Sequence, residues 1–297
     1  MTEPYDFPLH THALPVGGGH VLHVEEWGRA DGLPALLLHG GPGSGCSPLL
    51  RRGFDLERYR LICPDQRGAG QSTPRGEIAN NTTAKLLDDL WLLRRRLGIE
   101  RWLVVGGSWG ATLALAHALD QPEAVSALLL RNTFLARESD IQGFFSGAPQ
   151  ALARGWPTLP ELDEEPARAL ALRWWGWERH RSGQPEDAPA PSGEALAALV
   201  DRYRVQAHYL RQGCGLQSPP LLERCAALPQ VPVRLLHGAQ DAVCPPLGAQ
   251  ALQAVVPWAE LELLPGVGHD PAHPLLQDAL QRALDAYAAR GDFGELE

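Results

Sequence analysis

Lysine is almost absent from this chain, since Lys85 is the only one among 297 residues. Lysine and arginine together number 26 against 35 acidic residues, which gives a net charge of −9, and the arginines are dispersed along the chain. Nucleic-acid binding needs a concentrated cationic surface that neutralises phosphates. The composition therefore argues against a nucleic-acid partner.

Paired cysteines are also lacking. The chain has five cysteines, an odd number without any CxxC spacing: Cys46, Cys63, Cys214, Cys225 and Cys244. A chain of this length can bury a sizeable core and needs no disulfide to hold it. We expect reduced thiols that bind no metal.

Long apolar runs are missing as well. No segment approaches the roughly 18 uninterrupted apolar residues of a membrane span. The N-terminal stretch MTEPYDFPLH is polar and acidic, without a basic region leading into an apolar run. We expect a protein that is cytoplasmic and has no membrane partner.

What the chain does contain is an alternation of short apolar runs with helix-length segments. This alternation is typical of an α/β protein with a mostly parallel central sheet flanked by helices. Strands are expected at residues 21–27, 35–38, 60–63, 102–105, 127–130, 233–236 and 261–264. Amphipathic helices are expected at residues 82–97, 111–119 and 274–289.

One long segment breaks this rhythm. Residues 137–225 contain four tryptophans, a proline-rich stretch and helical patterns, but no convincing buried strand. We interpret the segment as a helical insertion that divides the α/β core into residues 1–136 and 226–297.

The stretch WLVVGGSWGATLALAHAL places a serine between an apolar strand and a helix. Its GGSWG motif fits G-x-S-x-G, in which small residues allow a sharp turn that projects the serine at the helix N-terminus. An ordinary serine in a glycine-rich turn is the alternative. Because a strand and a helix flank the motif, we interpret Ser108 as a nucleophile.

A serine hydroxyl needs a base and an orienting acid further along the chain. Asp241 follows the expected strand 233–236, and His269 follows the expected strand 261–264. Both positions lie at the carboxyl ends of strands, where open α/β sheets place their sites. Asp270 and His273 are nearby alternatives, but the glycines before His269 give its loop more freedom to reach inward.

An acyl-transfer reaction also needs backbone donors for its oxyanion. The stretch ALLLHGGPGSG supplies a glycine turn after a strand, and Gly41 is the preferred donor with Gly40 as the alternative. The second donor is the N–H of Trp109, which follows the serine. A nucleotide-binding loop is the weaker interpretation, because the stretch completes neither phosphate-binding glycine pattern.

Beyond these local patterns, the sequence resembles the proline iminopeptidases. The matching stretches are LHGGPGSG, PDQRGAGQSTP, NNTT, GGSWGATLALAHALDQPEAV, HGAQDAVCPP and GVGH. The resemblance implies an α/β-hydrolase fold with an inserted helical cap and no cofactor. It also implies a triad of Ser108, Asp241 and His269, oxyanion donors at Gly41 and Trp109, and a short peptide with a free N-terminus as the substrate.

In the resembled family, cap carboxylates hold the cationic amine of the substrate. Trp174-Trp175-Gly176-Trp177-Glu178 matches the W-x-x-W-E stretch that carries one of them, whereas the second carboxylate position is Gln206. An amide can accept a hydrogen bond but supplies no countercharge. Glu178 is then the main charged anchor for the amine, and Trp175 is interpreted as core.

Two aromatic residues complete the resemblance. Phe134 and Phe145 match positions that line the proline pocket in the family, and Leu210 replaces an aromatic residue.

The resemblance thus implies a serine exopeptidase that releases an N-terminal residue, preferably proline, through an acyl-enzyme. An esterase or amidase with the same triad is the first alternative, and a non-catalytic ligand-binding relative is the second. The oligomeric state stays open.

Overall fold

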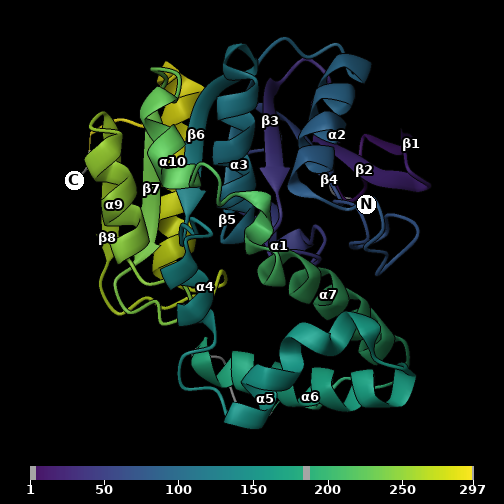
Figure 1. Ribbon diagram of the computed structural model, residues 1–297. Coiled ribbons are helices and arrows are strands. Elements are labelled where there is room, and N and C mark those ends of the chain that lie inside the picture. The colour runs from purple at the N-terminus through teal and green to yellow at the C-terminus, as the bar shows by residue number, and fades with distance from the viewer. Residues whose placement is uncertain (1–4, 183–187, 296–297) are drawn as a thin grey trace.

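A computed structural model describes residues 5–182 and 188–295. In these residues the strands form one eight-stranded sheet of order β1-β2-β4-β3-β5-β6-β7-β8 (Figure 1). The strands are β1 His10–Gly17, β2 His20–Gly28, β3 Leu33–Leu38, β4 Tyr59–Pro64, β5 Trp102–Gly107, β6 Val125–Arg131, β7 Val233–Gly238 and β8 Ala259–Leu264. In this order the neighbouring strands from β4 to β8 are parallel, whereas β2 is antiparallel to both of its neighbours, β1 and β4. The expected mostly parallel sheet is confirmed.

All seven expected strands are present, and β1 was not foreseen. This strand lies at one edge of the sheet and buries a single side chain, Leu14. Its sequence, HTHALPVG, therefore lacks the run of apolar residues that is typical of a strand in the interior of a sheet.

Helices cover both faces of the sheet. They are α1 Pro48–Arg51, α2 Thr83–Arg96, α3 Trp109–Asp120, α9 Leu247–Val255 and α10 Pro274–Arg290. Alternate residues of β5 enter two different apolar clusters, because successive side chains of a strand point to opposite faces. Helices α2, α3 and α9 contribute to one cluster and α10 to the other.

Between β6 and β7, the described residues form helices and no strand of the sheet. The helices are α4 Glu138–Phe144, α5 Gln150–Gly155, α6 Glu164–Arg181, α7 Gly193–Arg211 and α8 Leu221–Arg224. Figure 1 shows α5, α6 and α7 as a layer beyond the carboxyl ends of the parallel strands. The division of the chain at residues 137 and 225 stays a prediction, although the helical character of the insertion is clear.

The insertion has an apolar cluster of its own. Trp156 and Trp174 stack with their ring centroids 4.2 Å apart, and Tyr203 of α7 meets Trp156 edge-on at 4.7 Å. Further along α7, Val205 and Tyr209 belong to the main cluster on the sheet. Helix α7 therefore joins the insertion to the core.

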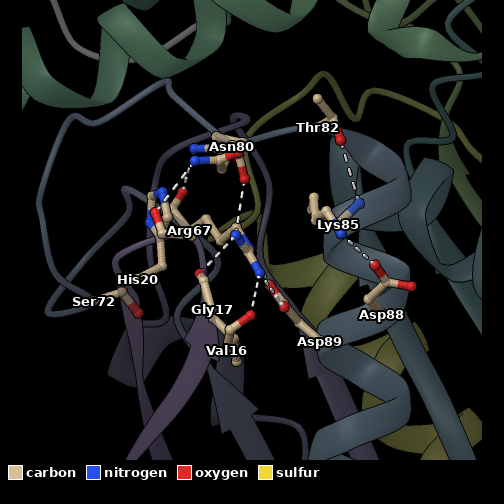
Figure 2. Close-up of polar contacts among 12 residues, drawn as sticks. Val16, Gly17, His20, Arg67, Ser72, Asn80, Thr82, Lys85, Asp88 and Asp89 are labelled. Atoms are coloured by element: carbon tan, nitrogen blue, oxygen red, sulfur yellow. Dashed lines mark hydrogen bonds and ion pairs between the residues drawn. The ribbon is translucent and has the colours of Figure 1, made fainter.

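A buried arginine ties the β1–β2 hairpin to α2 and to the loop after β4 (Figure 2). Arg67 donates to both carboxylate oxygens of Asp89, at 2.6 and 2.7 Å, and to the carbonyl groups of Val16, Gly17 and Asn80. The Arg67 and Asp89 side chains are only 1% and 3% exposed. Burial raises the pKa of Asp89 despite the attraction of Arg67, so desolvation outweighs the ion pairing. Such a pair is costly to break, because the remaining charge stays buried.

We expect Asp89→Asn to destabilise the protein by about 3–5 kcal/mol, because it leaves the Arg67 guanidinium without its counterion. Chemical denaturation followed by circular dichroism would measure the loss. The matched control is Lys85→Met, which breaks the Lys85–Asp88 pair on the same helix, where the side chains are 50% and 66% exposed. This change should cost about 0.5 kcal/mol or less. Equal effects of the two substitutions would contradict the expectation.

None of the helices in the described ranges is both long and apolar enough to cross a membrane.

Candidate active site

Ser108 occupies a strained turn between β5 and α3. Its backbone angles are φ 55° and ψ −122°, in a region that residues with side chains rarely adopt. The Ser108 N–H donates to the carbonyl of Arg131 on the neighbouring strand at 3.0 Å, and its carbonyl accepts from the N–H of Ala111 at 3.0 Å. The strand and the helix thus hold the strained residue from both sides.

The flanking glycines make this turn sterically possible. A Cβ on Gly106 would collide with the carbonyl of Gly110, and a Cβ on Gly110 would collide with the carbonyl of Leu38 on β3. A Cβ on Gly107 would lie 2.5 Å from Cζ of Arg131. Helix α3 therefore approaches the sheet so closely that the GGSWG motif is required at these positions.

An acid and an imidazole are paired at the ends of β7 and β8. His269 Nδ1 lies 2.7 Å from Asp241 Oδ2, while Asp241 Oδ1 accepts the N–H groups of Val243 and Cys244 at 2.8 Å each. Burial by itself raises the pKa of Asp241, but His269, the Cys244 N–H and His237 together lower it. An ionised carboxylate can only accept, so Nδ1 donates the proton of this bond, and in the tautomer with a single ring proton Nε2 is an acceptor.

The alternative residues, Asp270 and His273, have local positions in the loop and at the start of the next helix. Asp270 accepts the N–H of Ala272 at 3.0 Å, and His273 stands at the N-cap of α10.

Ser108 and His269 line one cavity of about 370 Å³. Gly41, Glu178 and Gln206 line it too, so the structure brings most of the sequence-predicted site residues together. Ser108 Oγ lies 3.9 Å from the sulfur of Cys244, whose N–H is bound to Asp241. The loop that holds the acid therefore also contacts the serine.

Trp109 contributes its backbone to this region and its side chain to the core. Its indole N–H donates to Gln66 Oε1 at 2.8 Å, and its ring meets Tyr209 edge-on. Trp109 is the first residue of α3. The backbone N–H groups of the first helical turn have no acceptor within the helix, so the N–H of Trp109 is free to bind another group.

The nitrogen and the oxygen of the Gln206 side-chain amide have different surroundings. Gln206 Nε2 donates to the carbonyl of Gly41 at 2.8 Å, while Oε1 is buried and has no hydrogen-bond partner within the described residues. A buried acceptor without a donor costs about 1–3 kcal/mol. Gln206, which lines the cavity, thus retains one acceptor whose hydrogen bond is not made within the described residues.

Glu178 has partners that the sequence analysis missed. Tyr203 O–H donates to Glu178 Oε2 at 2.8 Å, and Arg202 Nη2 lies 3.2 and 3.4 Å from the two carboxylate oxygens. Glu178 lies at the cavity wall, and the guanidinium of Arg202 beside it was not expected from the sequence. The spacing of Arg202 and Gln206 by four residues, which places them on one helix face, could have indicated it.

The aromatic lining also differs from the expectation. Phe134 packs in the main apolar cluster and Phe145 packs against Trp174, and neither is among the residues that line the cavity. Phe144 and Trp175 line it instead. Helix α6 turns residues 175, 178 and 179 toward the cavity, and its C-cap Ser182 lines the cavity too. Trp175 is therefore a wall residue and Trp174 is core.

We expect Gly110→Ala to lower the free energy of unfolding by about 2 kcal/mol or more, because the new methyl group must displace the Leu38 carbonyl or α3. Thermal unfolding would measure it. Gly176→Ala is the control: it lies within α6, no atom stands within 4 Å of its added Cβ, and it should gain about 1 kcal/mol. Unchanged stability of Gly110→Ala would show that the turn tolerates a side chain.

Comparisons with known proteins identify the fold and the family. Residues 34–273 match a family model described as the alpha/beta hydrolase fold. A probable proline iminopeptidase of Leptolyngbya boryana is 34% identical, with 97% of each chain covered. A proline iminopeptidase of Xylella fastidiosa (strain 9a5c) is 36% identical, with 94% of this chain and 97% of the relative covered.

Solved structures show the same fold at lower identity. A putative epoxide hydrolase from Pseudomonas aeruginosa superposes with a TM-score of 0.67 at 23% identity and covers 97% of this chain and 98% of its own. A proline iminopeptidase from Mycobacterium smegmatis superposes with a TM-score of 0.65 at 19% identity, covering 95% and 100%. With the curated relatives matched over nearly their full length, this chain belongs to the proline iminopeptidase family of the α/β-hydrolase fold.

Proposed function

We propose that this protein is a serine exopeptidase that releases an N-terminal residue, preferably proline, from short peptides with a free N-terminus. The observation that carries the proposal is the Asp241–His269 pair at the cavity where the strained turn presents Ser108. The identity of about 34–36% to proline iminopeptidases supports the choice of substrate.

In the proposed mechanism, His269 Nε2 takes the proton of the Ser108 hydroxyl while Oγ attacks the carbonyl carbon of the first residue. Asp241 holds the imidazole in the tautomer that leaves Nε2 free and stabilises the imidazolium that forms. The protonated imidazole then gives its proton to the departing amine. Water, activated by the same nitrogen, hydrolyses the acyl-enzyme and restores Ser108.

The oxyanion of each tetrahedral intermediate is assigned to the backbone N–H groups of Gly41 and Trp109. Gly41, in the glycine loop after β3, lines the same cavity as Ser108, and Trp109 follows the serine at the start of α3. The partial positive charge of a helix N-terminus favours an anion at this position.

The amino group of the substrate is assigned to Glu178 and Gln206. Glu178 offers a carboxylate at the cavity wall, and the unpartnered Oε1 of Gln206 offers a second acceptor for an N–H group. A substrate donor bound there would offset the cost of this buried acceptor. Phe144 and Trp175 supply the apolar wall, in place of Phe134 and Phe145.

We expect Ser108→Ala to abolish cleavage of a chromogenic prolyl anilide, because no other hydroxyl is presented by the strained turn. Steady-state kinetics would measure the loss, and an unchanged unfolding temperature would show that the fold is intact. Ser126→Ala is the control, since the Ser126 hydroxyl contacts Tyr287 O–H at 2.7 Å on the far helix α10. Activity of Ser108→Ala above background would refute the assignment.

We expect Asp241→Asn to lower kcat by about 10⁴-fold. The asparagine oxygen would keep the N–H groups of Val243 and Cys244, so its NH₂ group would face His269 Nδ1. Nδ1 would then have to accept, and the proton would move to Nε2, where the base is needed. A loss of less than about tenfold in the same assay would show that Asp241 does not set the tautomer.

A further inference from the structure

The cavity holds an ion pair at the place assigned to the substrate amine. Arg202 Nη2 lies 3.2 Å from Glu178 Oε2, and both side chains line the cavity with exposures of 32% and 19%. The Glu178 carboxylate accepts from Tyr203 O–H as well. Its charge is therefore already matched by a guanidinium, and part of its hydrogen-bonding capacity is taken.

The other side chains of the cavity wall do not restore a negative charge. In the part of the chain that the structure describes, Glu178 is the one carboxylate that lines this cavity, whereas Arg131, Arg179 and Arg202 are its guanidinium groups. Gln206 is neutral. An ammonium that approaches Glu178 also approaches Arg202, and like charges in a partly desolvated site repel strongly.

The backbone fixes Arg202 in this position. A Cβ on Gly43 would lie 2.6 Å from the Arg202 carbonyl oxygen, so α7 packs directly on the glycine loop that carries Gly41. Gln206, one turn further along α7, donates to the Gly41 carbonyl and holds the same contact. The Arg202 guanidinium also lies over the Tyr203 ring, with Cζ 5.2 Å from the ring centroid. Helix and loop together keep the cation beside Glu178.

We propose that Arg202 is a specificity-determining residue that cancels the charge of Glu178, so that the site accepts acyl groups with or without a cationic amine. The inference rests on the proposed aminopeptidase-type activity and extends its substrate class to acyl groups that are uncharged at this position. Arg202 acts through Glu178 and takes no part in bond cleavage.

The test compares two anilides of nearly the same shape, prolyl and cyclopentanecarbonyl, in which a CH₂ group replaces the ring NH₂⁺. The measured quantity is the ratio of their kcat/KM values. We expect the wild-type protein to favour the prolyl anilide by less than about tenfold, since the pair leaves little net charge. Arg202→Met should raise the ratio by about tenfold or more through faster prolyl cleavage, because it frees the Glu178 charge.

Two further variants distinguish the effect of the Arg202 charge from a general effect on the structure of α7. Arg202→Lys keeps the cation and should keep the wild-type ratio. Arg211→Met removes another arginine of α7, one that pairs with Glu161 and does not line the cavity, and should leave the ratio unchanged. Unfolding temperatures of all variants would be measured beside the kinetics.

The outcomes distinguish this inference from the proposed function. A ratio that Arg202→Met leaves unchanged or lowers, including an equal loss on both substrates, would overturn the role of Arg202 alone. A wild-type protein that cleaves neither anilide would overturn the proposed function, and the inference with it.

Discussion

The close packing of α3 against β3 and β5 is the constraint on which the rest of the site depends. Gly106 and Gly110 leave no room for a Cβ, and between them Ser108 is held at positive φ. Strain of this kind persists only where the surrounding structure determines the conformation, and here a strand and a helix both do so. The result is a hydroxyl presented at the edge of the sheet, beside the first turn of α3.

The parallel sheet brings the other groups to that hydroxyl. Strands β7 and β8 run parallel to β5, so the loops that follow them open at the same edge as the turn at Ser108. Asp241 is bound there by two backbone N–H groups and by His269. The contact between Cys244 and Ser108 links the loop of the acid to the serine, and Ser108 and His269 line the same cavity.

The helical insertion supplies charged and polar side chains to the cavity beside Ser108. Helix α7 packs on the glycine loop at Gly43 and carries both Arg202 and Gln206 toward the cavity. One of these residues neutralises Glu178 and the other presents an uncharged acceptor. The core therefore preserves the geometry of the α/β hydrolases, while the electrostatics of the insertion bear on the substrate.

The sequence by itself determined the α/β sheet, the helical insertion and the expected positions of Ser108, Asp241 and His269, because buried strands and the nucleophile turn leave strong local patterns. It did not indicate β1, whose exposed edge position leaves little apolar signal. Only the tertiary structure decided that Trp175 rather than Trp174 faces the cavity, and that Arg202 neutralises Glu178 across 24 residues of chain. Those outcomes depend on how α6 is rotated and packed against α7, and a rotation of one residue, about 100°, changes which side chains meet.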